Sequence, residues 1–402
     1  MIVNIFKDLN NIKNYLILCI FIPIFFTIND GFYNANLIDT SGSLDLFTKP
    51  LPISVILCPV ILLLSFKNNN INSKIFFLFL ILVSSIFILN ISFLEFNSIK
   101  LKYFLQMIFP ISGLFIGFNS EKINLKILFY FITVFIVFQL GVTLLSGYIL
   151  IRANLIFFTV YQNLQYVSTT IIIIGFIIVL SKENKISKTQ ENLFIILLTI
   201  YASLSFGFSN LIIYFFGISV FFLFKRKVKL KYFLFIILSF FLILNSISKI
   251  NLKSNVNKFQ HDRSYKPKQI DKILNLEIPN NIQVRINILM DFFEQKFKIE
   301  EIFIGKKNLN FFLQHNSSHN YFLDTLLING IFFPIIVMIL IFCLLIYNCR
   351  RNNNIFFLSI FFFIFAILIE NSFKVAMRQP YSGLITYFFL GYFYNSLFAK
   401  KF

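Results

Sequence analysis

Residues 319–333, HNYFLDTLLINGIFF, mark the point where a polar segment ends and a long apolar segment begins. Gly330 follows Asn320 after nearly three helical turns, so we expect His319 at the mouth of a helix and Gly330 deep inside it. A titratable ring at a membrane boundary can bind or transfer a proton. A glycine at depth lets another helix or a lipid chain approach closely. A helix cap followed by a packing glycine is the simpler interpretation of the same residues.

The composition of the chain is typical of a membrane protein. Of its 402 residues, 58% are hydrophobic, and no Trp is present. Many apolar runs approach the roughly 20 residues that a helix needs to span a bilayer. We therefore expect an all-α polytopic membrane protein, in which Tyr is left to mark the membrane interfaces.

The net charge of +19 does not indicate a nucleic-acid partner. The basic residues are scattered between apolar runs and form neither a contiguous patch nor a known nucleic-acid-binding module. Nucleotide-driven transport has no support either, because the chain has no Walker-type glycine loop and no dinucleotide fingerprint.

The apolar runs predict about twelve transmembrane helices. Lys and Arg of the short connections concentrate on the side of the N-terminus, which places both termini in the cytoplasm. The chain then divides into helices one to nine (1–248), a large periplasmic loop (249–318) and helices ten to twelve (319–402). The predicted spans are 14–28, 51–66, 75–94, 103–118, 127–149, 166–181, 193–205, 210–224, 232–248, 320–347, 355–370 and 383–398.

The loop 249–318 is the longest polar segment; it contains His261 and His315, and the third histidine, His319, follows directly after it. Residues 284–293 have helical periodicity, and we expect an amphipathic helix there that lies on the outer leaflet. Residues 302–305 are expected to form an apolar turn.

A metal site is not expected in this loop. His315 and His319 are spaced so that they can share one helix face, but the segment between them lacks the glutamate of a zincin, and no Cys lies nearby. We therefore predict neither a metal nor another cofactor.

Arginines are few on the predicted outer side. Arginine suits a lipid-linked phosphate because its guanidinium can donate two parallel hydrogen bonds. The simpler interpretation is pairing with local acids, such as Arg285 with Asp291 or Arg378 with Glu370. Glu370, near the end of a span, is itself a functional candidate because burial of an acid there is costly. The outer arginines are Arg152, Arg263, Arg285 and Arg378.

The stretch quoted first resembles the signature of the O-antigen polymerase and O-antigen ligase superfamily. That signature has His, then Asn, Ser or Gln, nine residues, Gly, two residues, and finally Gly, Thr or Tyr. His319, Asn320 and Gly330 match it, whereas Phe333 departs from it at the last position. The surrounding order of span, long outer loop, histidine and span also fits the family.

Three further elements are similar to the family: an arginine followed by a helix and a glycine in the long loop, an arginine before the sixth span, and an Arg–Pro element between the last two spans. One element departs, because the tight turn at Ser209-Asn210 lacks the arginine that the family often carries there. The similar elements are Val284-Arg285-Ile286 with Ile304-Gly305, Arg152 with Gln162-Asn163, and Arg378-Gln379-Pro380.

The resemblance implies metal-independent glycosyl transfer from an undecaprenyl-pyrophosphate-linked oligosaccharide at the periplasmic face of the bacterial inner membrane. His319 would orient or deprotonate the acceptor hydroxyl, and Asn320 would hold that ring or a sugar hydroxyl. Gly330 would leave room for the polyprenyl chain. The arginines would bind the pyrophosphate and stabilise the charge that develops on it, with Arg285 as the catalytic one and Arg152, Arg263 and Arg378 as binding residues.

The run from Ser318 to Asp324 resembles polymerases more than ligases, so we expect transfer onto another lipid-linked repeat unit during lipopolysaccharide biosynthesis. The alternatives are an O-antigen ligase, which uses the lipid A core as acceptor, and a polysaccharide flippase of another class. A flippase would be expected to carry charged residues inside its spans, which here are almost free of charge. Partners are membrane lipid and, if the polymerase assignment holds, a chain-length regulator.

Overall fold

The computed structural model describes most of the helices of the chain. Its only strands in the described part are β1 (Phe25–Phe26) and β2 (Leu51–Pro52), which pair antiparallel. The described residues are 2–23, 25–26, 51–65, 81, 84–85, 88, 109–120, 123–146, 164–205, 208–229, 231–234, 238, 280–307, 309–315, 317–351 and 355–398.

The described helices form two groups along the chain. The first part lies before the long polar loop, and the second part begins inside that loop at Asn280. The first part contains α1 (Ile2–Cys19), α2 (Ile53–Ser65), a helix at Phe109–Phe118, α5 (Leu125–Ser146), α6 (Leu164–Leu180), α7 (Lys188–Ser205), α8 (Phe208–Ser219) and the π-helical turn η3 (Val220–Lys225). The second part contains α11 (Asn280–Phe293), α12 (Ile299–Ile304), α13 (Asn310–His315), α14 (Tyr321–Asn329), α15 (Phe332–Arg350), α16 (Phe357–Phe373), the 3-10 turn η4 (Ala376–Arg378) and α17 (Pro380–Phe398).

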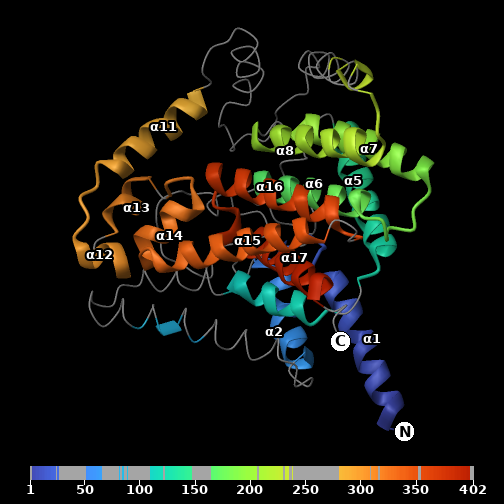
Figure 1. Cartoon of the computed structure of the whole chain (residues 1–402), viewed down its shortest axis with the longest axis horizontal. Coiled ribbons are helices and arrows are strands. Elements are labelled where there is room, and N and C mark those ends of the chain that lie inside the picture. Colours follow the sequence, from blue (N-terminus) through green and yellow to red (C-terminus); the bar gives the residue numbers. More distant parts are fainter. Residues whose placement is uncertain are drawn as a thin grey trace.

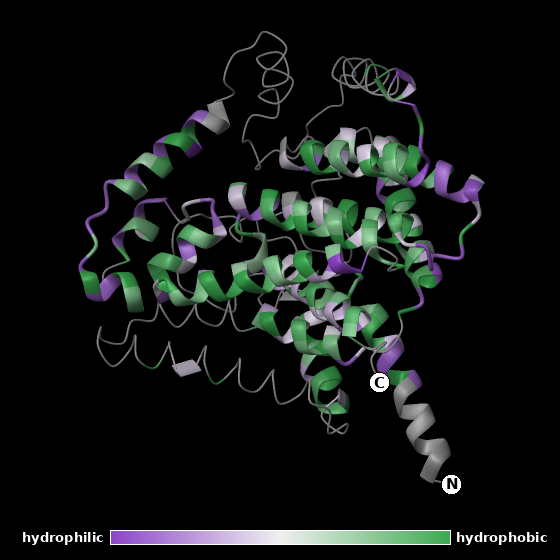
Figure 2. Cartoon of the chain, in the orientation of Figure 1, coloured by the Kyte–Doolittle hydropathy of each residue, from purple (hydrophilic) through white to green (hydrophobic). Residues whose placement is uncertain are grey.

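Apolar helices pack side by side to form the body of the protein. α16 contacts α6, α8 and α15, and α17 contacts α6 and α15 (Figure 1). Hydrophobic residues dominate these helices, and hydrophilic residues gather at the two ends of the body (Figure 2). The short helices α11, α12 and α13 lie together at one end, whereas both termini lie toward the other (Figure 1).

The last helix, α17, lies in the core. Nearly every side chain from Tyr381 to Tyr394 is buried, which is expected for a helix that is apolar on all sides. Its buried hydroxyls form hydrogen bonds; for example, the hydroxyl of Tyr381 donates to the carbonyl of Phe21 at 2.7 Å. Tyr387 shares a 2.9 Å hydrogen bond with Tyr321 of α14, so this core helix also supports the end of the long loop.

Glycines let the helix at Phe109–Phe118 approach α17 closely. A Cβ at Gly117 would clash with the carbonyl oxygen of Phe388, and one at Gly391 would clash with that of Leu114. Small residues at such crossings are typical of helix pairs in membranes, where close backbone packing replaces the hydrophobic effect between helices.

The prediction of one continuous span at 320–347 is wrong. The structure breaks this segment into α14 and α15, and the break falls at Gly330, which has φ 72° and ψ −171°. Only glycine populates this region readily, because a side chain there would collide with the backbone. Gly330 therefore ends a helix instead of lying deep inside one.

A second glycine lies against this break. Gly305, at φ 92°, ends α12, so residues 302–305 are a helix end instead of the expected turn. A Cβ at Gly330 would clash with the carbonyl of Phe303. Two backbone hydrogen bonds fasten the crossing, one from Lys306 N to Leu327 O and one from Ile331 N to Ile302 O, both 2.8 Å long.

One helix in the described part, α15, is long and apolar enough to cross a membrane by itself. Shorter apolar helices cover six more segments: Ile53–Ser65, Phe109–Phe118, Leu125–Gly141, Tyr166–Leu180, Ser209–Lys225 and Phe357–Phe373. The predicted spans 75–94 and 232–248 lie almost entirely outside the described residues. The chain is thus helical as expected, while the number of twelve spans stays a prediction.

Candidate functional site

The C-terminal end of α16 contacts two of the predicted site residues through its backbone carbonyls. Nη1 of Arg285 in α11 donates to the carbonyl of Phe373 at 2.8 Å. Nδ2 of Asn320, which precedes α14, donates to the carbonyl of Ser372 at 3.3 Å. We call residues 372–378 the linker; they comprise the last two residues of α16 and the segment through η4. The linker therefore brings the long loop and the start of α14 to one place.

Arg378, at the end of the linker, is buried and paired with a buried acid. Its Nη1 donates to Oδ2 of Asp324 in α14 at 2.8 Å. The same carboxylate accepts from the hydroxyls of Ser317 and Ser318 and from the backbone N–H of Ser318, at 2.6–2.8 Å. The simpler interpretation named Glu370 as the acid that pairs with Arg378, whereas the ion pair in the structure is with Asp324.

His319 follows the two serines in a left-handed conformation. Its φ is 56°, which is uncommon outside glycine but less so for histidine than for most residues. Its N–H donates to the hydroxyl of Ser317 at 2.9 Å, and Asp324 holds that serine in turn. The imidazole nitrogens have no hydrogen-bond partner within the described residues, so the ring is available to a substrate.

The electrostatic surroundings keep the His319 ring neutral. Burial, together with the nearby charges of Arg285 and Arg378, lowers the pKa of His319 from 6.5 to about 4, and Asp324 offsets part of this effect. The usual pKa of histidine, on which a general-base role was expected to rest, therefore does not apply in the substrate-free protein. The neutral ring accepts hydrogen bonds at pH 7 but is a weak base.

Asn320 caps α14. Its side-chain oxygen accepts from the N–H groups of Phe322 and Leu323 at 3.0 and 3.1 Å, which satisfies two of the donors at the helix start. The helix-cap interpretation of this residue is therefore confirmed. Because the oxygen is used by the cap and the amide nitrogen by Ser372, Asn320 makes no hydrogen bond to the His319 ring in this structure.

Arg285 is a half-buried cation. Burial lowers the pKa of its guanidinium, while the nearby hydroxyl of Tyr166 has the opposite effect. It makes no ion pair with a described acid, so the predicted pairing with Asp291 is wrong. Asp291 contacts Nε2 of His315 at 3.1 Å instead.

A buried lysine takes part in a second polar cluster beside the linker. Nζ of Lys374 donates to Thr169 at 3.0 Å and to Asn210 at 3.3 Å, and it lies 5.6 Å from the ring centre of Tyr166. Asn210 belongs to the turn that lacks the arginine expected from the resemblance, and the cation beside it is this lysine. Glu370 is also buried there, within electrostatic range of Lys374 and Tyr166.

Three important residues were missing from the sequence-based site: Asp324, Lys374 and Tyr166. Asp324 could have been found, because an acid inside an apolar stretch and in the first turn of a helix is a signal in itself. Lys374 had been considered only for topology and as a possible partner of Glu370. Tyr166 looked like an ordinary interface marker, and its proximity to Arg285 and Arg378 depends on long-range folding.

The remaining predicted residues lie elsewhere. Gly330 is at the far end of α14, roughly 15 Å along the helix from its cap by the ordinary rise per residue. The space beside Gly330 holds the backbone of Phe303, not the lipid chain that was expected there. Arg152, Arg263 and His261 lie outside the described residues.

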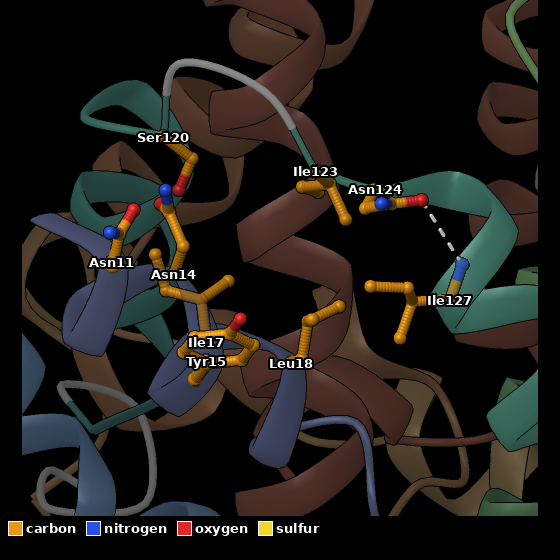
Figure 3. Close-up of a pocket in the computed structure, with 9 residues that line it drawn as sticks. All are labelled: Asn11, Asn14, Tyr15, Ile17, Leu18, Ser120, Ile123, Asn124 and Ile127. Carbon is orange, nitrogen blue, oxygen red and sulfur yellow. Dashed lines mark hydrogen bonds between the residues drawn. The ribbon is translucent and has the colours of Figure 1, made fainter.

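Neither the histidines nor the clearest pocket adds a ligand site to this region. A search of the described side chains finds no group of three His, Cys, Asp or Glu able to hold a metal. A pocket of about 190 Å³ lies between α1 and the start of α5 (Figure 3). α1 lies on the side of the termini, away from α14 (Figure 1). Its polar lining consists of Asn11, Asn14, Tyr15, Ser120 and Asn124.

Comparison of the chain with models of protein families, with curated proteins and with solved structures finds no match.

Proposed function

We propose that the chain is an O-antigen polymerase of the bacterial inner membrane, which joins lipid-linked oligosaccharide repeats at the periplasmic face. The observation that supports this proposal most is the convergence of His319, Arg285 and Arg378 around the linker. These residues come from a loop helix, a helix mouth and the connection between two apolar helices, and the sequence resemblance expects them in one site.

Arg285 is suited to bind the diphosphate of the donor. Its charge is not neutralised by a described carboxylate, and its half-buried position strengthens electrostatic interactions compared with water. In the reaction, the bond between the anomeric carbon and the phosphate oxygen breaks, and the lipid diphosphate leaves with additional negative charge. A preorganised guanidinium stabilises that charge as it develops.

Arg378 has a different role, because Asp324 already holds one of its nitrogens. We assign Arg378 to positioning: with Asp324, it fixes the linker against the serine turn that presents His319. Lys374 adds a second cation near Tyr166, next to the same region.

His319 accepts a hydrogen bond from the acceptor hydroxyl, whose oxygen forms the new bond to the anomeric carbon. The hydroxyl proton passes to the ring and from there to water. A donor diphosphate bound at Arg285 offsets the positive charge that lowers the pKa of His319. The ring therefore becomes a stronger base when the donor is bound, which couples proton removal to the presence of both substrates.

The experiment is a lipopolysaccharide ladder gel from a strain lacking the gene, complemented with wild-type, His319→Ala or Arg285→Ala protein. His315→Ala and Arg350→Ala are matched controls, because both residues lie outside the proposed site. We expect a core with a single repeat unit in the deletion strain and in both site variants, and a normal ladder in both controls.

Other outcomes identify the alternatives. Accumulation of lipid-linked polymer without transfer to the core would indicate a ligase. Loss of every repeat from the periplasmic side, with lipid-linked single repeats retained in the cytoplasm, would indicate a flippase. A normal ladder from well-expressed His319→Ala protein would remove His319 from the mechanism.

A further inference from the structure

The short helix α12 exposes apolar side chains that the rest of the loop does not cover. Ile299 is 76% exposed, and Ile302 and Phe303 on the same helix are exposed as well. Phe293, at the end of α11, is 73% exposed. An exposed group of this size at the end of a helical body needs a partner to shield it from water.

The amphipathic helix α11 was expected to use its apolar face against the outer leaflet, but that face packs inward. Ile288 and Phe292 are buried, and the Phe292 ring lies 5.8 Å from that of Phe311 in α13. The exposed face of α11 is mixed: Gln283 and Asn287 are polar, whereas Val284 and Met290 are apolar. The most exposed apolar side chains of the loop are Ile299 of α12 and Phe293 at the adjoining end of α11.

α12 is fixed at the level where α15 begins. Ile302 accepts the hydrogen bond from Ile331, and the rings of Phe303 and Phe332 lie 5.8 Å apart. α15 has 19 residues. At the ordinary rise, a helix of that length covers about 28 Å, close to the thickness of the hydrocarbon core. If α15 crosses the bilayer, Phe332 and α12 lie at the boundary between the acyl chains and the head groups.

The exposed side chains of α15 continue the same surface. Ile335, Ile339, Phe342 and Ile346 are exposed at helical spacing, and Phe332 begins this stripe next to Phe303. The apolar residues of α12 therefore extend the lipid-facing stripe of α15 instead of forming a separate patch. This continuity favours acyl chains as the occupant, because the same phase would cover both surfaces.

Of the two acids of α12, Glu300 is exposed and Glu301 is engaged by the backbone around the helix. The Glu301 carboxylate accepts from the backbone N–H groups of Lys298 and Lys307, so it is used within the turn around α12. Long Lys side chains at such a boundary can extend toward the head groups while their stems stay in apolar surroundings.

We propose that α12, together with Phe293, inserts into the outer leaflet at the hydrocarbon boundary and binds lipid acyl chains through Ile299, Ile302 and Phe303. The proposal rests on the membrane location of the proposed function but not on glycosyl transfer. Its consequence is that the long loop, including Arg285, is held at a defined depth in the membrane.

The absence of Trp makes a direct test practical, because any Trp introduced is the only one in the chain. We would reconstitute full-length Ile299→Trp and Phe303→Trp proteins into vesicles with and without lipids brominated on their acyl chains. Ile339→Trp, on the exposed stripe of α15, is the membrane control, and Asn287→Trp, at an exposed polar position of α11, is the water control. Elution as in the wild type on size-exclusion chromatography verifies folding.

We expect brominated lipid to quench Ile299→Trp and Phe303→Trp, with blue-shifted emission, while Asn287→Trp is quenched by aqueous iodide instead. Iodide quenching of both α12 variants, equal to that of Asn287→Trp, would overturn the proposal. Blue-shifted emission without quenching by either reagent would also overturn it, since polypeptide would then cover the patch. Ile339→Trp must respond to brominated lipid in the same vesicles. If it does and the ladder test fails, the proposed reaction is wrong while the lipid contact stands.

Discussion

Asp324 and Arg378 form a buried ion pair in which Nη1 of the arginine donates to the carboxylate at 2.8 Å. The same carboxylate holds Ser317 and Ser318, the two residues that precede His319. One acid therefore sets both the position of the linker and the conformation of the turn that presents the imidazole. A substitution of Asp324 should therefore disturb both the linker and the turn that carries His319.

We predict that Asp324→Asn destabilises the protein and abolishes the proposed polymerisation. The substitution keeps the size of the side chain but leaves the Arg378 cation buried without its acid, and breaking such a pair costs about 3–5 kcal/mol. Thermal unfolding of the detergent-purified protein measures the loss. Asp291→Asn is the matched control, because Asp291 is exposed. Equal melting temperatures for the two variants would contradict the importance of the buried pair.

The pH dependence of the reaction should reflect the neutral state of His319. Because the pKa of this ring is lowered to about 4, protonation should reduce kcat/KM only as the pH falls through about 4, not through 6.5. The pKa of His319 obtained from the pH dependence of kcat, which describes the donor-bound protein, should be higher, because the diphosphate offsets the arginine charges. Identical values from kcat and kcat/KM would argue against coupling between Arg285 and His319.

The same arginine provides a further check on this prediction. Arg285 lowers the pKa of His319, so Arg285→Gln should move the acidic limb of kcat/KM upward, toward 6.5, in whatever activity remains. The sign for stability is consistent. Between pH 6.5 and 4 the unfolded chain binds a proton at this residue that the native protein does not, so the native state loses stability on acidification.

Gly330→Ala should destabilise the junction of α14 and α15. The backbone conformation at this position costs a non-glycine residue about 1–3 kcal/mol. The new Cβ would also displace the carbonyl of Phe303. Gly141→Ala is a control with the opposite sign, because it lies inside α5 with nothing within 4 Å of the added Cβ. Thermal unfolding should show a loss for the first variant and no loss for the second.

Asn320→Ala should cost about 1 kcal/mol of stability through loss of the helix cap, whereas Asn320→Ser should retain most of it. Both variants lose the amide that donates to the carbonyl of Ser372, so their difference isolates the cap. Comparing their melting temperatures measures this difference. If Ala and Ser are equally destabilising, the contact with Ser372 matters and the cap does not.

Parts of this fold could be predicted because they depend on local patterns. The periodicity of residues 284–293 predicted α11, which the structure confirms as Asn280–Phe293. The polar-to-apolar transition at Asn320 located the start of α14. These features need only the spacing of apolar residues and the chemistry of a cap, both of which are visible in a short window of sequence.

The features that could not be predicted depend on contacts between distant segments. Gly330 looked like a packing glycine in a long apolar run, because apolarity alone does not show that Phe303 crosses the chain there. Glu370, the nearer acid in sequence, was the acid considered as a partner of Arg378, whereas folding brings Asp324 from another helix. Proximity in sequence therefore does not identify the partner of a charged residue when the fold brings another helix closer.

The contacts of Arg285 and Asn320 with the linker end on carbonyl oxygens, those of Phe373 and Ser372, not on side chains. Every amino acid supplies a carbonyl, so these two positions can change identity over evolutionary time while both attachments persist. Both carbonyls belong to the last turn of α16, so their positions are set by where that helix ends. Adding or removing one residue within α16 would shift both attachment points at once, whereas substitutions that preserve the helix would leave both hydrogen bonds in place.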